Sequence, residues 1–135
     1  NVLVDTSIWC IAFRRLQHPD NFTISNALSA LIEEYRAKIT GPIRQEILSG
    51  IREQSQFTNL KERFRAFDDL PTTTPEYELA AKLFTACRRQ GVQGSHTDLL
   101  ICAVAQRNSC SIFTTDQDFQ SYRNFIEIEL YPVTA

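Results

Sequence analysis

The feature that most constrains the fold is the alternation of short apolar runs with helical segments along the chain. Apolar runs suited to strands occur at Val2–Val4, around Lys38–Thr40, at Ser111–Thr114 and at Ile126–Tyr131. No two of these runs are joined by a two-residue hairpin turn, and parallel strands need long crossover connections. The sequence therefore predicts an α/β fold in which helices cover both faces of a parallel sheet.

Helical periodicity gives the expected connections between the strands. Helices are expected after residue 5 up to Phe13, over Asn21–Lys38, from Pro42 to an end near Gly50–Gln54, over Phe57–Phe67, over Leu79–Cys87 up to a stop at Gly91, over Thr97–Gln106 and over Asp118–Tyr122. The second helix would place Tyr35 on its apolar face, and a linker is expected at Leu70–Pro75. The aromatic stripe of Phe57, Phe64 and Phe67 is interpreted as core rather than as a groove for a partner.

The composition fits one domain spanning residues 1–135. Apolar residues make up 43% of the chain and charged residues 22%, which excludes a disordered protein. The net charge of −2 lacks the broad positive field of a nucleic-acid coat protein, so any nucleic-acid contact must be local. No apolar run reaches the roughly 20 residues of a membrane span, and the start of the chain lacks a signal-peptide pattern. We expect a cytoplasmic protein without membrane contact, with four reduced cysteines.

Four acidic residues stand beside the ends of the predicted strands. Asp5 and Asp116 follow the first strand and the Ser111–Thr114 run, Asp98 opens an apolar helix, and Glu46 lies in the helix after the strand near Ile39. In open parallel sheets, ligands collect beyond the carboxyl ends of the strands. We therefore expect these four carboxylates to meet at one edge of the sheet.

Each acid also has a plain structural interpretation. Asp5 and Asp116 suit helix N-caps, Ser95 with Asp98 fits a capping box, and Glu46 suits a solvated helix margin. Capping does not explain why all four fall at the same predicted edge. A carboxylate cluster without a cation repels itself, and oxygen ligands without His or Cys favour Mg²⁺, with Mn²⁺ as a plausible substitute.

These motifs resemble those of a known family. The segments VLVDTSIW, RQEILSGI, TDLLICAVA and IFTTDQDF resemble, in order and spacing, the PIN-domain family and specifically its VapC-like toxin ribonucleases. The resemblance covers essentially the whole chain. It implies a three-layer α/β/α sandwich, a Mg²⁺-dependent endoribonuclease site, a homodimer and a small antitoxin partner.

The resemblance also implies roles for individual residues. The four acids of the family match Asp5, Glu46, Asp98 and Asp116, as catalytic residues and metal ligands. Supporting hydroxyl residues match Thr6 or Ser7 and Thr114. Asp118 is a weaker match, and it is interpreted as a residue of a helix cap formed with Thr115.

The expected reaction follows from such ligands. One or two Mg²⁺ ions would activate a water for in-line attack on the RNA phosphodiester and leave a 5′-phosphate and a 3′-hydroxyl. Arg14, Arg44 and His96 are candidate RNA contacts, although a solvated His is the commoner case at a helix start. No aromatic stacking platform is evident in the sequence.

Other functions fit the sequence less well. A phosphoaspartate hydrolase would need a second Asp at position 7, which is Ser, and a receiver domain would need a late Lys, whereas none follows Lys82. Two alternatives stay open: a PIN-domain nuclease of RNA processing that is no toxin, and a catalytically silent PIN-like module that binds RNA or protein. The RNA target cannot be read from the sequence.

Overall fold

A parallel sheet divides the molecule between two groups of helices. The computed structural model describes residues 1–13 and 22–132. Its strands are β1 (Val2–Val4), β2 (Ala37–Thr40), β3 (Asp69–Leu70) and β4 (Ser111–Phe113), in the order β3-β2-β1-β4. All three strand pairs are parallel. The central strand β1 is fully buried, as expected for a sheet covered on both faces.

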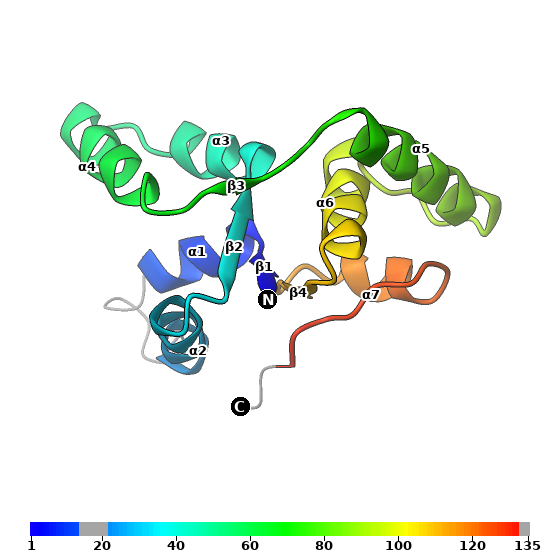
Figure 1. Ribbon diagram of the computed structural model, residues 1–135, viewed down its shortest axis with the longest axis horizontal. Coiled ribbons are helices and arrows are strands. Elements are labelled where there is room, and N and C mark those ends of the chain that lie inside the picture. The colour runs from blue at the N-terminus through cyan, green and yellow to red at the C-terminus, as the bar shows by residue number, and fades with distance from the viewer. Residues whose placement is uncertain (14–21, 133–135) are drawn as a thin grey trace.

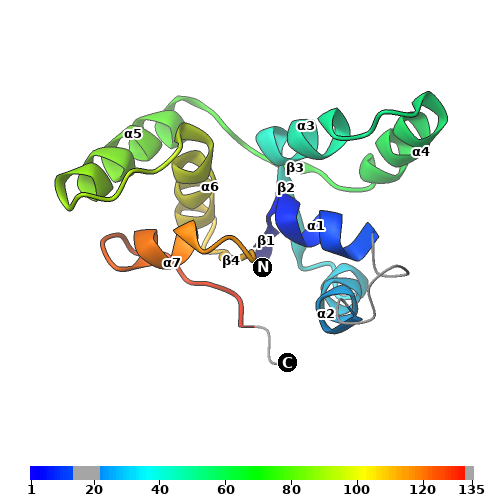
Figure 2. The ribbon, with the colours of Figure 1, turned by 180° about the vertical axis from the view of Figure 1, so that it is seen from behind.

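The helices lie on both sides of this sheet. They are α1 (Thr6–Phe13), α2 (Phe22–Glu33), α3 (Gly41–Ser49), α4 (Gln54–Phe64), α5 (Thr74–Arg89), α6 (His96–Arg107) and α7 (Asp118–Arg123). The first four lie on one side and the last three on the other (Figure 1), and the view from behind shows the same division (Figure 2). The predicted α/β/α fold is therefore confirmed. Within the described residues, no helix is long and apolar enough to cross a bilayer.

An aromatic cluster joins α1 to α4. Trp9 Nε1 donates a hydrogen bond to the Val4 carbonyl at 3.1 Å, which fixes the indole against β1. The ring of Phe64 meets Trp9 edge-on at 5.0 Å, and Phe67 does so at 5.5 Å. Phe64 is only 2% exposed, so its predicted place in the core is confirmed, whereas Phe57 is half-buried.

A buried charge fixes α5 against α6. The Glu76 carboxylate accepts hydrogen bonds from Thr73 N at 2.7 Å and from Thr73 Oγ1 at 2.6 Å, and it forms an ion pair with Arg107 of α6. These contacts complete a capping box at the start of α5. They also tie the start of α5 to the end of the helix that carries Asp98 at its other end.

The predicted helix Asn21–Lys38 is too long. The described part of α2 ends at Glu33, and Tyr35 adopts a left-handed φ of 58°. Arg36 N donates to Leu31 O at 2.8 Å, which is the pattern of a Schellman C-cap. Tyr35 is therefore 87% exposed instead of lying on an apolar helical face, and Lys38 belongs to β2. Asn21 lies outside the described residues.

The predicted last strand, Ile126–Tyr131, is also wrong. It reduces to one isolated parallel bridge between Ile112 and Leu130. Ile128 N donates to Ile126 O at 3.1 Å, and Gln106 Nε2 donates to the Glu127 carbonyl at 2.8 Å. These bonds occupy backbone groups of the segment that a longer ladder would need. Conversely, the two-residue strand β3 overlaps the linker expected at Leu70–Pro75, because it is too short to show a period.

Candidate metal centre

Asp5 is the most buried of the candidate acids. It follows β1 directly and is 8% exposed. Because Val4 pairs with Phe113, the end of β4 brings Thr114 beside Asp5, and Thr114 Oγ1 donates to Asp5 Oδ2 at 2.8 Å. Ser7 Oγ donates to the same oxygen at 3.3 Å. Burial raises the pKa of the Asp5 carboxyl, and the two hydroxyl hydrogen bonds oppose this rise.

Asp98 lies in the first turn of α6 and is half-buried. The Ser95 hydroxyl caps the helix by accepting a hydrogen bond from Asp98 N at 3.0 Å. The Asp98 carboxylate accepts a hydrogen bond on Oδ2 from the Tyr122 hydroxyl at 2.7 Å. Burial raises the pKa of Asp98, and the Tyr122 and Ser95 hydrogen bonds oppose the rise. The predicted cap therefore involves the backbone N–H of Asp98, whereas the Asp98 carboxylate binds the Tyr122 hydroxyl.

Asp116 and Asp118 follow β4 and are exposed. Asp116 N donates to Thr114 Oγ1 at 3.0 Å, and Asp118 N donates to Asp116 Oδ1 at 2.9 Å. Asp118 is thus held through Asp116, and not through the cap by Thr115 that the sequence suggested. One carboxylate oxygen from each of Asp98, Asp116 and Asp118 lies within 4.8 Å of the others.

Glu46 approaches from the other side of the sheet, on α3. This helix begins as its sequence predicts, since Thr40 Oγ1 accepts from Ile43 N at 3.4 Å and Pro42 lies in the first turn. Partial desolvation raises the pKa of Glu46, and the charges of Asp5 and Asp98 raise it further. Asp116 likewise raises the pKa of Asp5, and both of these acids raise the pKa of Asp98. Asp98 therefore interacts electrostatically with the other three predicted acids, whereas the carboxylates that come within 4.8 Å of one another are those of Asp98, Asp116 and Asp118.

The donor set fits a hard divalent cation. In residues 1–13 and 22–132, no Lys or Arg forms an ion pair with any acid of this cluster, so no basic side chain there neutralises its negative charge. The Thr6 hydroxyl is buried and makes no well-formed hydrogen bond there, although it lies near Glu46 and lowers the pKa of that carboxyl. Oxygen donors without nitrogen or sulfur are the ligands that Mg²⁺ and Mn²⁺ prefer.

Tyr122 is a site residue that the sequence reasoning missed. It is 1% exposed and comes from α7, four residues after Asp118. Burial and the adjacent Asp98 carboxylate raise the pKa of its phenol, so the hydroxyl stays a donor. The spacing of four residues from Asp118, which places both on neighbouring turns of one helix, was the available signal.

The three predicted RNA contacts have different outcomes. Arg14 lies outside the described residues. Arg44 donates to Asp69 Oδ1 at 3.0 Å and to the carbonyls of Phe64 and Phe67 at 2.9 and 2.7 Å. It would have to leave this network to bind RNA. His96 is exposed and stacks on Phe84 at 4.7 Å, with the Arg88 guanidinium 5.5 Å from the Phe84 ring. A role of His96 in RNA binding stays a prediction.

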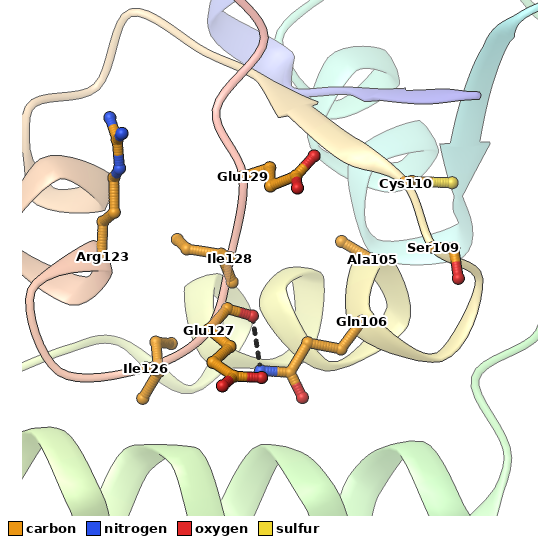
Figure 3. A pocket seen from close by; sticks show the side chains of 9 residues that line it. All are labelled: Ala105, Gln106, Ser109, Cys110, Arg123, Ile126, Glu127, Ile128 and Glu129. Atoms are coloured by element: carbon orange, nitrogen blue, oxygen red, sulfur yellow. Dashed lines mark hydrogen bonds between the residues drawn. The ribbon is translucent and has the colours of Figure 1, made fainter.

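A cavity of about 690 Å³ lies away from the acids. Its lining includes Ser109 and Cys110, which precede β4, whereas Asp116 follows that strand. Glu127 and Glu129 of the C-terminal segment also line it, and a hydrogen bond joins the Gln106 side chain to the Glu127 carbonyl (Figure 3). None of the clustered acids lines this cavity.

Fold and site together define a class of protein. A parallel sheet lies between two helical layers, and oxygen ligands suited to a divalent cation gather at the carboxyl end of its strands. The sequence profile of the PIN domain matches residues 2–124, and the chain belongs to this family. PIN domains are generally nucleases and typically use divalent metals. No curated protein sequence matches the chain.

Solved structures share the whole fold. FitAcB from Neisseria gonorrhoeae is 19% identical, with a TM-score of 0.75 over 98% of this chain and 97% of that one. VapBC2 from Rickettsia felis, bound to a DNA fragment from its promoter, is 17% identical, with a TM-score of 0.72 over 96% of each chain. A toxin–antitoxin complex from Klebsiella pneumoniae is 20% identical, with a TM-score of 0.66 over 88% of this chain and 90% of that one. At these identities the likeness concerns the fold.

Proposed function

We propose that the protein is a Mg²⁺-dependent endoribonuclease and the toxin of a VapBC-type toxin–antitoxin pair, with residues 1–135 forming one PIN domain. The observation that carries the nuclease proposal is the cluster itself. Asp98, Asp116 and Asp118 offer carboxylate oxygens within 4.8 Å of one another, and Asp5 and Glu46 interact electrostatically with Asp98. Within the described chain these acids have no basic partner, and the chain is a member of a family of nucleases. A protein that only binds RNA has no use for such mutual repulsion.

The roles of the residues follow from their surroundings. Asp5, Asp98 and Asp116 would hold the cation, with Glu46 as a further ligand or as the group that orients water, and Asp118 completes the exposed side of the cluster. A bound divalent cation would supply a Lewis acid for the phosphodiester and a nucleophilic water. Thr114 and Ser7 keep the Asp5 carboxylate oriented through their hydrogen bonds. The buried Thr6 hydroxyl, which makes no well-formed hydrogen bond within the described residues, would be available to support a ligand.

The toxin proposal has separate support. The similar structures from Rickettsia felis and Klebsiella pneumoniae are, by their descriptions, a VapBC protein and a toxin–antitoxin complex. We therefore infer a small antitoxin as partner, a homodimer as the assembly, and the cytoplasm as the location. Expression without the antitoxin should arrest growth. Normal growth together with RNA cleavage by the purified protein would move the function to RNA processing.

Cleavage of total cellular RNA tests the nuclease proposal. The wild type should cut in Mg²⁺ and stop in EDTA, and Asp5→Asn should reduce the rate at least about a hundredfold. Asp68→Asn is the matched control, because it removes an exposed acid from the α4–β3 connection. Equal cleavage by Asp5→Asn, or cleavage in EDTA, would overturn the proposal. If the wild type binds RNA without cutting, the silent binding module becomes the better interpretation.

A further inference from the structure

A second cavity is lined by Thr114, which hydrogen-bonds to Asp5 of the acid cluster. It has a volume of about 380 Å³ and lies between α2, the end of β4, α7 and the C-terminal segment. Thr114 and Thr115 form its border with the cluster. Thr114 Oγ1 donates to Asp5, and Thr115 N donates to Ser7 Oγ at 3.1 Å. A molecule in this cavity would therefore lie beside the residues that orient the proposed metal ligands.

Arg123 gives this cavity an unneutralised positive charge. It is exposed in the last turn of α7, and its side chain has no ion pair or hydrogen bond in the described part of the chain. Arg123 also lines the first cavity, and Figure 3, which draws that cavity, shows its side chain extending away from Gln106 and Glu127. A guanidinium without a partner among the described residues suits a ligand that carries a negative charge, such as a phosphate.

The remaining walls suit a nucleobase and its sugar. Tyr131 lines the cavity and packs on Phe113 at 5.1 Å, which gives an apolar aromatic wall. Gln120 is exposed on α7, one turn before Arg123, and its amide can both donate and accept hydrogen bonds. Phosphate, base edge and aromatic face thus each have a counterpart within one cavity.

We propose that this cavity binds the nucleotide adjacent to the cleaved phosphodiester of single-stranded RNA, with Arg123 on its phosphate and Gln120 on the edge of its base. This inference rests on the proposed ribonuclease function and extends it, because it assigns a substrate subsite to α7. Arg123 and Gln120 are binding residues here, and the acids keep the chemistry. A consequence is that part of the base preference next to the cleavage point comes from Gln120.

The test compares Arg123→Ala with Arg65→Ala, which removes an exposed arginine at the end of α4, on the other side of the sheet. Steady-state cleavage uses a single-stranded RNA oligonucleotide that contains a mapped cleavage site. Arg123→Ala should raise KM about tenfold, with kcat changed much less, because a lost charge-assisted hydrogen bond weakens binding. Arg65→Ala should match the wild type. Gln120→Ala should change the base preference beside the cut.

A binding arm separates this inference from the proposed function. Fluorescence anisotropy in the Asp98→Asn background measures affinity for the same oligonucleotide without cleavage. Arg123→Ala should weaken binding about tenfold there as well, and thermal unfolding shows whether the fold is retained. Equal affinity of Arg123→Ala and Arg65→Ala would overturn the subsite, whether or not the wild type cuts RNA. If the wild type binds RNA through Arg123 but does not cut it, the nuclease proposal is refuted and the binding subsite stands.

Discussion

Asp98 depends on a tyrosine from another segment of the chain. The Tyr122 hydroxyl occupies Asp98 Oδ2, which leaves Oδ1 as the less encumbered oxygen. Gly94 lets this tyrosine approach, since a Cβ at position 94 would overlap Leu99 and lie 3.1 Å from Tyr122 Cε1. The acids could be singled out from the sequence because Asp5 and Asp116 follow strands and Asp98 opens an apolar helix. Tyr122 could not, because its role depends on how α7 docks against the start of α6.

Tyr122→Phe should weaken metal binding. The change removes one hydroxyl and keeps the ring, so Asp98 loses a hydrogen bond worth about 1.5 kcal/mol and becomes free to turn. We expect affinity for Mn²⁺, measured by calorimetric titration, to fall about tenfold. Tyr131→Phe is the control, because it removes a hydroxyl from a ring packed on Phe113. Identical Mn²⁺ affinity in Tyr122→Phe and the wild type would refute a positioning role.

Gly94→Ala should disturb the contact between Tyr122 and Asp98 by changing the residue against which the Tyr122 ring packs. The new methyl must displace the fully buried Leu99 or the Tyr122 ring, at a cost of about 1–3 kcal/mol. Urea unfolding should show this loss, and Mn²⁺ affinity should fall with it. Gly50→Ala is a control, since a Cβ there meets only ordinary contacts at 3.5 Å or more. Unchanged stability in Gly94→Ala would show that the close approach does not constrain Tyr122.

At the scale of elements, the helices and the buried strands could be predicted from periodicity, but the edges of the sheet could not. The alternation of Ile126, Ile128 and Leu130 resembles a strand, yet its backbone groups are taken by Gln106 and by a local turn. The pairing of β3 depends on Ile39 and on the Arg44 network, which no local pattern reveals. Edge pairing is set by tertiary contacts rather than by local sequence.

Phe64→Ala should destabilise the packing of α4 against α1. Phe64 is fully enclosed between Trp9 and Phe67, so its truncation leaves a cavity and should lower the free energy of unfolding by about 3–5 kcal/mol. Phe57→Ala, at a half-buried position of the same helix, should cost clearly less. Urea denaturation of both variants measures the difference. Equal losses would contradict the assignment of Phe64 to the core.

For the whole molecule, the net charge takes on a different meaning once the cluster is known. The 16 acidic residues include the four proposed ligands, and the other 12 are outnumbered by the 14 Lys and Arg residues. The overall value of −2 is therefore compatible with a mildly basic surface around an acidic centre. We expect RNA affinity to fall when the divalent metal is removed, because the cluster then repels the phosphates.

The stability of the metal-free protein should rise as pH falls from neutrality toward the ordinary pKa of Asp and Glu carboxyls, about 4. Asp5, Glu46 and Asp98 all have raised pKa values, so the folded state binds more protons than the unfolded chain in this range. Glu76, whose pKa is lowered chiefly by Thr73, loses its stabilising effect only below its unfolded value of about 4.3. Urea titrations in EDTA measure this slope. A stability that rises with pH in EDTA would contradict it.

Divalent metal should reverse that dependence. Mg²⁺ at a hundredfold excess over its Kd should add about 2.7 kcal/mol near neutral pH, and protons should compete with it as pH falls. The same titrations in Mg²⁺ instead of EDTA provide the measurement, and Asp98→Asn, which lacks one ligand, should gain clearly less. Equal gains in the variant and the wild type would mean that Mg²⁺ binds elsewhere.

The chemistry of the RNA ends tests the central claim most directly. Purified protein is incubated with RNA in Mg²⁺, and the new ends are identified by ligation that requires a 5′-phosphate and by extension that requires a 3′-hydroxyl. Attack by water oriented in the acid cluster predicts 5′-phosphate and 3′-hydroxyl ends, produced by the wild type and lost in Asp5→Asn. Ends with a 2′,3′-cyclic phosphate, or wild-type ends that persist in EDTA, would contradict the account.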